Sequence, residues 1–181
     1  MKTVNKRLIG LIVISIIQLS FPFFFIASKE NILKNGKEYI FKIEPVDPYD
    51  FFQGRYIDLN VSRLGFTPKD TSEFKRFDIV YAEFDQDTSG VKITSLSHKK
   101  TKYSLKLKLK SRRLNPIKVS LPFNRFYLEE NKAKNIEKLI RLNRKNPSFV
   151  HVLILNGEFV IKDISSNGKS LVTGKSVNSP T

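Results

Sequence analysis

An uncharged apolar run near the N-terminus constrains this chain more than any other feature. Residues 8–27 (LIGLIVISIIQLSFPFFFIA) contain no charged side chain. As a helix they would span roughly 30 Å, the thickness of the hydrocarbon core of a bilayer. The run predicts a transmembrane helix, in which Pro22 is tolerated and introduces a kink. A cleaved signal peptide is the alternative, although the run exceeds an ordinary signal-peptide core and residues 25–27 (FIA) are a poor cleavage site.

Basic residues before the run predict its orientation. Lys2, Lys6 and Arg7 form a basic tip over residues 1–7, and the positive-inside tendency keeps such a tip in the cytoplasm. Lys29, Lys34 and Lys37 make the other flank basic too, so the charge pattern favours this orientation without requiring it. We expect residues 28–36 to be a linker and the rest of the chain to lie outside the cytoplasm, in a periplasmic or equivalent space, tethered to the inner (cytoplasmic) membrane.

The remainder of the chain is rich in short strand patterns. Alternating apolar residues bounded by turn residues predict strands at 38–43, 56–61, 77–84, 91–96 and 103–109, with weaker candidates at 117–121 and 126–128. Two further strands, 149–155 and 159–164, flank Asn156-Gly157, a strong hairpin signal.

One segment follows a helical period instead. Residues 129–145 place Ala133, Ile136 and Ile140 on one stripe with Leu139 beside it, which predicts an amphipathic helix. The tail, residues 165–181, is small and polar, and we expect it to be disordered. Residues 37–164 therefore predict a mostly β (β-rich α+β) domain, a small antiparallel barrel or sandwich with one amphipathic helix, and the strand spacing leads us to favour the barrel.

The stretch EPVDPYDFFQGRYIDL, residues 44–59, predicts a corner between a strand, a short helix and a second strand. Asp47 suits an N-cap, Pro48 the first helical position, and Asp50 the third. Gly54 suits the left-handed position that ends such a helix. We expect that replacing Asp47 with Ala costs about 1 kcal/mol of stability.

A catalytic or metal-binding role for this stretch is the alternative reading. Asp47, Asp50 and Asp58 could form an acidic cluster, but a calcium loop needs more oxygen ligands at regular spacing. Two carboxylates could serve glycoside hydrolysis, but the sequence does not determine the distance between them. We therefore expect a structural role.

The same residues resemble the signature of the GDYXXLXY family, small bacterial membrane-anchored proteins of unassigned function. Gly54, Tyr56 and Leu59 match the named motif, whereas Arg55 stands where it has Asp and Val61 where it has the final Tyr. The preceding pattern PVDPxDxxxG is the more specific match, through Pro45, Asp47, Pro48, Asp50 and Gly54. The resemblance implies a membrane-anchored domain associated with polytopic membrane proteins, and it implies no reaction.

Positive charge is concentrated in one segment. Residues 88–128 contain 11 Lys or Arg and no Asp or Glu, and so supply +11 of the net +15. In a strand, Tyr103, Leu105, Leu107 and Leu109 face the core, while Ser104, Lys106, Lys108 and Lys110 face solvent. The predicted anion-binding or lipid-binding residues are Lys99, Lys100, Lys102, Lys106, Lys108, Lys110, Arg112 and Arg113.

Three interpretations of this basic face compete. Lysines on an exposed edge strand discourage edge-to-edge pairing. They could also bind anionic lipid headgroups or an envelope polymer, at about 1 kcal/mol for each basic residue near the surface. Nucleic-acid binding is disfavoured, because it requires a cytoplasmic domain and because leucines that face inward cannot stack on bases.

No catalytic pattern is evident. The chain has no Cys and no G-x-S-x-G elbow, and His98 and His151 lack metalloprotease spacing. We expect His151 to be a core or strand-face histidine. We expect no enzyme activity, no cofactor and no metal, and a non-catalytic accessory or structural module that binds a polytopic membrane protein or another envelope partner. The alternative is a polyanion-binding domain on anionic lipid or cell-wall polymer, and a Ser/Lys hydrolase is a minor alternative.

Overall fold

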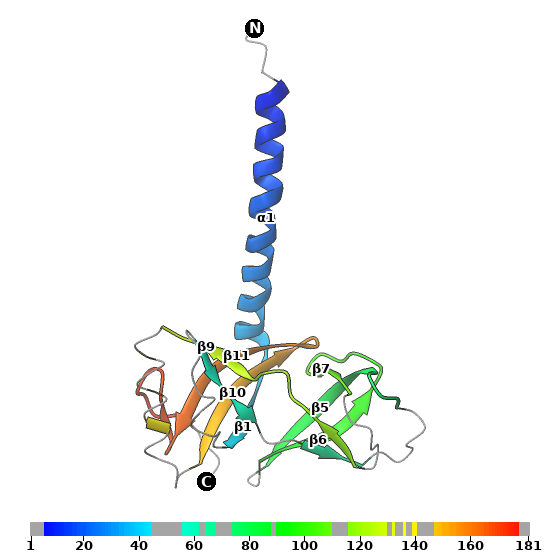
Figure 1. Cartoon of the computed structure of the whole chain (residues 1–181), viewed down its shortest axis with the longest axis vertical. Helices are drawn as coiled ribbons and strands as arrows, with labels where there is room; N and C mark the ends of the chain where they lie inside the picture. The colour runs from blue at the N-terminus through cyan, green and yellow to red at the C-terminus, as the bar shows by residue number, and fades with distance from the viewer. Residues whose placement is uncertain are drawn as a thin grey trace.

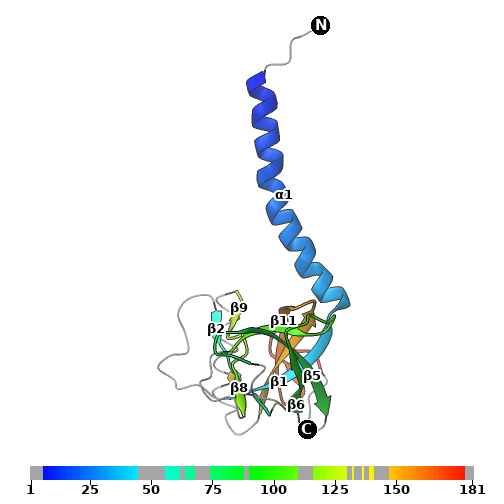
Figure 2. The same ribbon diagram turned by 90° about the vertical axis from the view of Figure 1, so that its right-hand side faces the viewer.

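A long N-terminal helix leads into a β-rich domain (Figure 1). The computed structural model describes residues 6–44, 56–61, 64–67, 74–87, 90–109, 116–129, 132, 136, 139–140 and 147–177. The helix α1 spans Lys6–Asn35 and contains Pro22. Figure 2 shows α1 changing direction about halfway along its length, as a helix does where a proline removes a backbone hydrogen bond.

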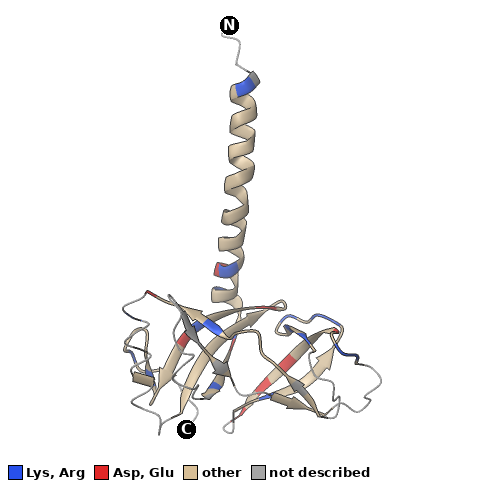
Figure 3. Cartoon of the chain, viewed as in Figure 1, with Lys and Arg blue, Asp and Glu red and all other residues tan. Residues whose placement is uncertain are grey.

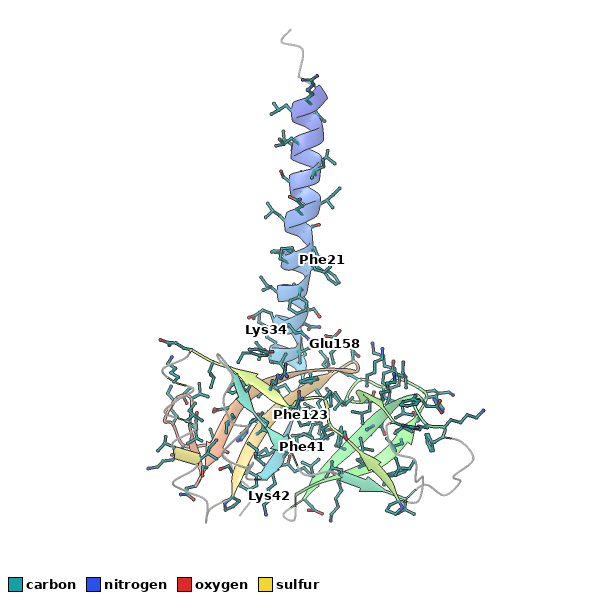
Figure 4. The ribbon with its side chains drawn as sticks, in the orientation of Figure 1. Phe21, Lys34, Phe41, Lys42, Phe123 and Glu158 are labelled. Carbon is teal, nitrogen blue, oxygen red and sulfur yellow. The ribbon has the colours of Figure 1, made fainter. Side chains whose placement is uncertain are left out.

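The apolar part of α1 makes no contact with the domain. Its large side chains from Leu8 to Ile26 are all exposed, and Figure 4 shows Phe21 pointing away from the helix far from the domain. By length and composition, α1 is able to cross a membrane or to act as a signal sequence. The sequence prediction of an apolar helix is therefore confirmed.

The expected linker is part of this helix. Residues 28–35 continue α1 to Asn35 without a break. The helix ends at Gly36, whose N–H donates to the carbonyl of Ile32 at 2.8 Å. A Cβ at this position would lie 2.5 Å from the same carbonyl oxygen, so a larger residue does not fit without a shift of the backbone. Residues 28–35 are therefore helical where we expected a linker, because the Lys and Glu residues after the apolar run are good helix formers.

The larger sheet has five antiparallel strands in the order β12-β11-β10-β1-β3. Its strands are β1 (Lys37–Glu44), β3 (Asn60–Val61), β10 (Ser148–Leu155), β11 (Glu158–Ser166) and β12 (Lys169–Ser170). The predicted hairpin joins β10 to β11. Its turn residues Asn156 and Gly157 have φ of 51° and 83°, as a two-residue turn with both central residues in the left-handed region requires.

The remaining described strands form three smaller antiparallel sheets. The largest, in the order β6-β5-β7, contains β5 (Ile79–Asp87), β6 (Gly90–Ser97) and β7 (Leu105–Lys108). In the others, β2 (Tyr56–Asp58) pairs with β9 (Arg125–Tyr127), and β4 (Leu64–Phe66) pairs with β8 (Ile117–Val119). Each predicted strand has a counterpart, whereas β4 and β12 were not predicted.

The two larger sheets lie on opposite sides of the domain in Figure 1. The described strands do not close into a barrel. The mostly β prediction is confirmed, and of its two architectures the sandwich-like one fits these sheets.

One aromatic core joins the sheets. Phe41 of β1 packs its ring 5.5 Å from that of Phe84 on β5 and 4.8 Å from that of Phe123, and Figure 4 shows Phe41 and Phe123 between the two sides of the domain. All eight residues of β10 are buried, because this strand is central in its sheet.

The predicted helix and tail have different outcomes. Of residues 129–145, Lys132, Ile136, Leu139 and Ile140 are described and helical. Ile136 is buried and Ile140 packs against the core, as the predicted stripe requires, whereas Leu139, predicted beside the stripe, is exposed. Ala133 lies outside the described residues.

The tail has defined structure as far as Val177, so disorder was the wrong expectation for the described part of it. It turns at Asn167-Gly168 into β12, and the Val177 N–H donates to the Gly168 carbonyl at 2.9 Å. Leu171 and Val172 pack against the core, which accounts for its order.

Candidate functional site

The end of α1 is locked into the domain. Ile32 is only 3% exposed and belongs to a small apolar cluster with Leu153 and Leu155. Tyr103 and Val160 pack against the same cluster. Because a buried side chain restricts rotation of the helix relative to the domain, α1 and the domain are rigidly connected at this point.

A salt bridge strengthens the same junction. The Lys29 ammonium lies 2.9 Å from a carboxylate oxygen of Glu158, the first residue of β11. In Figure 4, Lys34 and Glu158 lie on the side of the domain from which α1 leaves, and Lys42 lies at the opposite end. The helix therefore defines a proximal and a distal end of the domain.

A lysine-rich loop lies at the proximal end. Lys99, Lys100 and Lys102, in the connection between β6 and β7, are all exposed. The Asn156 N–H donates to the Lys102 carbonyl at 2.7 Å, and the Gly157 N–H donates to the Ser104 carbonyl at 2.9 Å. Since Glu158 of the same hairpin binds Lys29, this loop is tied to the turn that contacts α1. Figure 3 shows blue segments along the upper rim of the β5–β6–β7 side, the rim that faces the helix.

The strand that follows continues the positive charge. Lys106 and Lys108 are exposed, whereas Leu105, Leu107 and Leu109 are at most 3% exposed, which confirms the predicted alternation. Ser104 breaks it, because it is fully buried and its hydroxyl donates to the Thr101 carbonyl at 2.9 Å inside the loop. We call the exposed lysines the basic surface: Lys99, Lys100, Lys102, Lys106 and Lys108. The other predicted members, Lys110, Arg112 and Arg113, lie outside the described residues.

The lysines of the basic surface are not paired with carboxylates in the described part of the chain. There, none of the five forms a salt bridge. Two of them contact aromatic rings instead, since the Lys102 ammonium is 5.1 Å from the Tyr103 ring centroid and that of Lys108 is 5.5 Å from the Phe77 ring centroid. The five lysines therefore form an exposed cluster of positive charge, which attracts anions electrostatically.

A groove of about 470 Å³ runs beside β7. Its lining includes Ile79 of β5, Lys106, Leu107 and Lys108 of β7, and Leu121, Pro122 and Asn124 after β8. β7 is an edge strand, since its sheet has the order β6-β5-β7. The groove therefore lies beside a cationic edge strand.

The residues of the corner motif are only partly described. Tyr56 pairs with Tyr127 across β2 and β9, and Leu59 is buried and donates its N–H to the Asn124 carbonyl at 2.7 Å. The strand predicted over residues 56–61 is interrupted at Leu59, because β2 and β3 pair in different sheets. Pro45, Asp47, Pro48, Asp50 and Gly54 lie outside the described residues, so the capped-corner interpretation stays a prediction.

A Glu–His–Ser array, which the sequence interpretation missed, lies on the five-stranded sheet. His151 Nδ1 is 2.9 Å from a carboxylate oxygen of Glu38, and His151 Nε2 is 2.8 Å from the Ser165 hydroxyl. The Lys162 ammonium binds the second oxygen of Glu38 at 2.8 Å. Burial alone would raise the pKa of Glu38, but hydrogen bonds and charge from Lys162 and His151 hold this pKa below its usual value.

This array resembles a hydrolytic triad in connectivity but not in accessibility. A nucleophile must reach its substrate, whereas Ser165 is fully buried and His151 is 3% exposed. His151 is therefore the buried strand-face histidine that we expected. Counting outward from the Asn156-Gly157 turn predicts that His151 pairs with Lys162. The observed partner is the next residue, Asp163, because a bulge after His151 shifts the register by one residue.

The described residues hold no evident metal centre. Among them, no group of three or more His, Cys, Asp or Glu side chains is placed to bind a metal ion. The positive charge, the groove and the α1 junction are therefore the features that call for a functional account.

Comparison with known proteins places the chain in a family. The family model described as GDYXXLXY protein matches residues 18–171, from within α1 to just after β12. No curated protein and no solved structure matches the chain. This match extends over most of the helix and domain described above, and the chain belongs to the GDYXXLXY family.

Proposed function

We propose that this chain is a single-pass, membrane-anchored module that binds rather than catalyses. In this proposal α1 stays in the cytoplasmic membrane with the N-terminus inside, and the domain rests on the outer headgroup layer. The basic surface then contacts anionic lipid headgroups. The observation that carries the proposal is the locked junction at Ile32, because it leaves no flexible linker between the apolar run and the cationic loop.

The spacing along α1 supports this position for the domain. From Ala27, the last residue of the apolar run, to Ile32 in the domain is five residues, or about 7.5 Å of helix. One headgroup layer has a thickness of roughly 5–8 Å, since a bilayer of 40–45 Å contains a hydrocarbon core of about 30 Å. The domain surface would therefore begin at the level of the headgroups.

The charge is sufficient to matter at that distance. Each basic residue close to an anionic surface contributes about 1 kcal/mol, and the contribution falls off within a Debye length of about 8 Å at physiological salt. Five lysines without a carboxylate partner would together favour the bound orientation by several kcal/mol at low salt. Headgroup contact should therefore be strongly salt-dependent.

Hydrogen exchange of the full chain in nanodiscs tests this proposal. In discs containing phosphatidylglycerol, we expect the amides of residues 98–104 to exchange more slowly than in discs of phosphatidylcholine alone. High salt, or the double variant Lys100→Glu/Lys102→Glu, should remove the difference. The control reverses a charge at the distal end, Lys42→Glu, and should leave the protection intact.

Two outcomes would contradict the proposal. One is equal exchange of residues 98–104 in neutral and anionic discs. The other is a mature chain, isolated from membranes, whose intact mass lacks the apolar run, since the domain would then have no anchor. Protease treatment of spheroplasts tests the topology, and we expect the domain to be digested from outside.

A second candidate function is that of an accessory module for a polytopic membrane protein, and the groove beside β7 favours it. Leu109 donates its N–H to Asp78 of the adjoining segment, and Lys106 donates to Gly157 on the other side. Hydrogen-bonding groups alternate along a strand, so the Lys108 N–H points to the same side of β7 as that of Lys106, beyond the part of this edge that Gly157 occupies. An extended segment of a partner could add to this edge as a further strand.

A pair of variants at one position tests this second function. Lys108→Ala and Lys108→Pro remove the same charge, but only proline removes the N–H at the free edge. If a partner adds as a strand, Lys108→Pro should lose detergent co-purification of that partner and Lys108→Ala should retain it at high salt. Equal retention by both variants would exclude strand addition at Lys108.

A further inference from the structure

Two large apolar side chains are exposed beside the basic surface. Phe77 is 52% exposed and Ile79 is 50% exposed. In the described part of the domain, only Tyr127 and Leu139 are comparably exposed among large apolar side chains. Ile79 pairs with Lys108 across β5 and β7, so the apolar pair and the lysines occupy one surface. Leaving half of a phenylalanine side chain in water forgoes the stabilisation that its burial would give, which calls for an explanation.

The backbone of Phe77 is held in an unfavourable conformation. Its φ is 72°, in the left-handed region that bulky residues avoid. Hydrogen bonds hold the turn in place, since the Phe77 N–H donates to the Leu109 carbonyl at 2.7 Å and the Lys75 N–H donates to the Asp78 carboxylate at 2.7 Å. Backbone strain of this kind persists only where the surrounding structure determines the conformation, and it clusters at functional sites. Here it presents an aromatic ring to the exterior.

Cations flank the Phe77 ring. The Arg76 guanidinium is 4.3 Å from the ring centroid, and the Lys108 ammonium is 5.5 Å from it. A ring bordered by positive charge is suited to the boundary between hydrocarbon and anionic headgroups, where the ring enters the apolar layer and the cations contact phosphate.

The turn that carries Phe77 lies next to the proximal lysine loop. His98, at the start of that loop, has its Nδ1 3.3 Å from the Ile79 carbonyl, and its ring stacks on Phe74 with centroids 5.7 Å apart. The start of β5 and the loop after β6 therefore form one end of the sheet. This end includes the upper rim of Figure 3, on the side of α1.

We propose that Phe77, with Ile79 beside it, inserts into the interfacial layer of the membrane as a second anchor for the domain. Arg76 and Lys108 bind phosphates on either side of the inserted ring. The inference rests on the proposed function, because it requires the proximal end to face lipid. It adds an apolar contact that salt does not screen, and it fixes the rotation of the domain about α1.

The absence of tryptophan from the chain provides a direct test. Phe77→Trp introduces a single indole at the predicted insertion point, and Lys42→Trp introduces one at the distal end as the control. The full chain is reconstituted in vesicles of phosphatidylcholine and phosphatidylglycerol, with and without lipids brominated near the headgroup. We expect bromine quenching and a blue-shifted emission for Phe77→Trp, and neither for Lys42→Trp. Equal quenching at the two positions would overturn the inference.

A second variant separates insertion from folding. Phe77→Asn suits a left-handed backbone, so the melting temperature of the domain should be unchanged or higher. At high salt, the protection of residues 98–104 that the apolar contact still provides in either kind of disc should fall below that of the unsubstituted chain.

The outcomes distinguish this inference from the proposed function. If residues 98–104 are protected by anionic lipid while Phe77→Trp is unquenched, the second anchor is wrong and the headgroup contact stands. If neither is observed, both are wrong. A third outcome has two parts: bromine quenches Phe77→Trp no more than the control, and the indole is protected from aqueous iodide in native membranes only. In that case a protein partner occupies this surface, and the lipid assignment is overturned.

Discussion

Replacing Ile32 with alanine should uncouple the anchor from the domain. Ile32 is 3% exposed in its cluster with Leu153 and Leu155. The substitution removes three carbons, worth about 0.8 kcal/mol each as buried methylene groups. Alanine recovers a few tenths of a kcal/mol through its higher helix propensity. The net loss is about 2 kcal/mol in the free energy of unfolding, or up to roughly thirtyfold in the unfolding equilibrium.

Urea unfolding of the full chain in detergent micelles measures this loss. Near-ultraviolet circular dichroism of the tyrosines reports on the domain. The matched control is Leu33→Ala, which removes the same number of carbons from the adjacent residue, whose side chain is 44% exposed. We expect a change within about 0.5 kcal/mol for this control, as for most surface substitutions.

A second measurement addresses the coupling itself. In anionic nanodiscs without urea, Ile32→Ala should reduce the protection of residues 98–104 from hydrogen exchange, whereas Leu33→Ala should not. If the two variants have equal stability and equal protection, Ile32 does not lock α1 to the domain, and the reasoning from the junction to the membrane-proximal lysines fails.

Other positions offer independent tests. Because the pKa of Glu38 is lowered in the folded domain, the stability that it contributes is present above its unfolded pKa and is lost as pH falls through the folded value. Acid titration of the melting temperature should therefore be flatter for Glu38→Gln. Gly157→Ala should lower the free energy of unfolding by about 1–2 kcal/mol, because the φ of Gly157 is 83° and a Cβ would lie 3.1 Å from Tyr81. The control Gly65→Ala should be near neutral in the same denaturation assay, because no atom lies within 4 Å of the added Cβ. Ser104→Ala should shift exchange of the loop amides upward, since the hydroxyl both donates to and accepts from Thr101.

The local patterns of the sequence were sufficient for most elements. The apolar run predicted α1, the Asn156-Gly157 pair predicted the β10–β11 turn, and period-two alternation predicted which leucines of β7 are buried. These features depend on interactions between neighbours in the chain, so they can be read from spacing alone.

The sequence-based predictions failed where a contact with a distant segment overrides the local conformational preference. Ser104 is buried by its loop, and the tail is ordered because Leu171 packs on the core. At the end of α1, a Cβ added to Gly36 would lie 3.1 Å from the Cβ of Leu153, which is far along the chain. Ser104 also bonds to a distant segment, since its carbonyl accepts the Gly157 N–H.

The candidate site divides in the same way. The chain's own sequence determined that it carries an apolar span, a mostly β domain and a concentrated run of lysines. Only the tertiary structure decided that the lysine loop is bonded to the hairpin that receives Lys29, and that Phe77 is exposed beside it. Composition and period depend on the order of residues, whereas the direction in which a surface faces depends on contacts between segments more than 50 residues apart, such as Lys102 and Asn156.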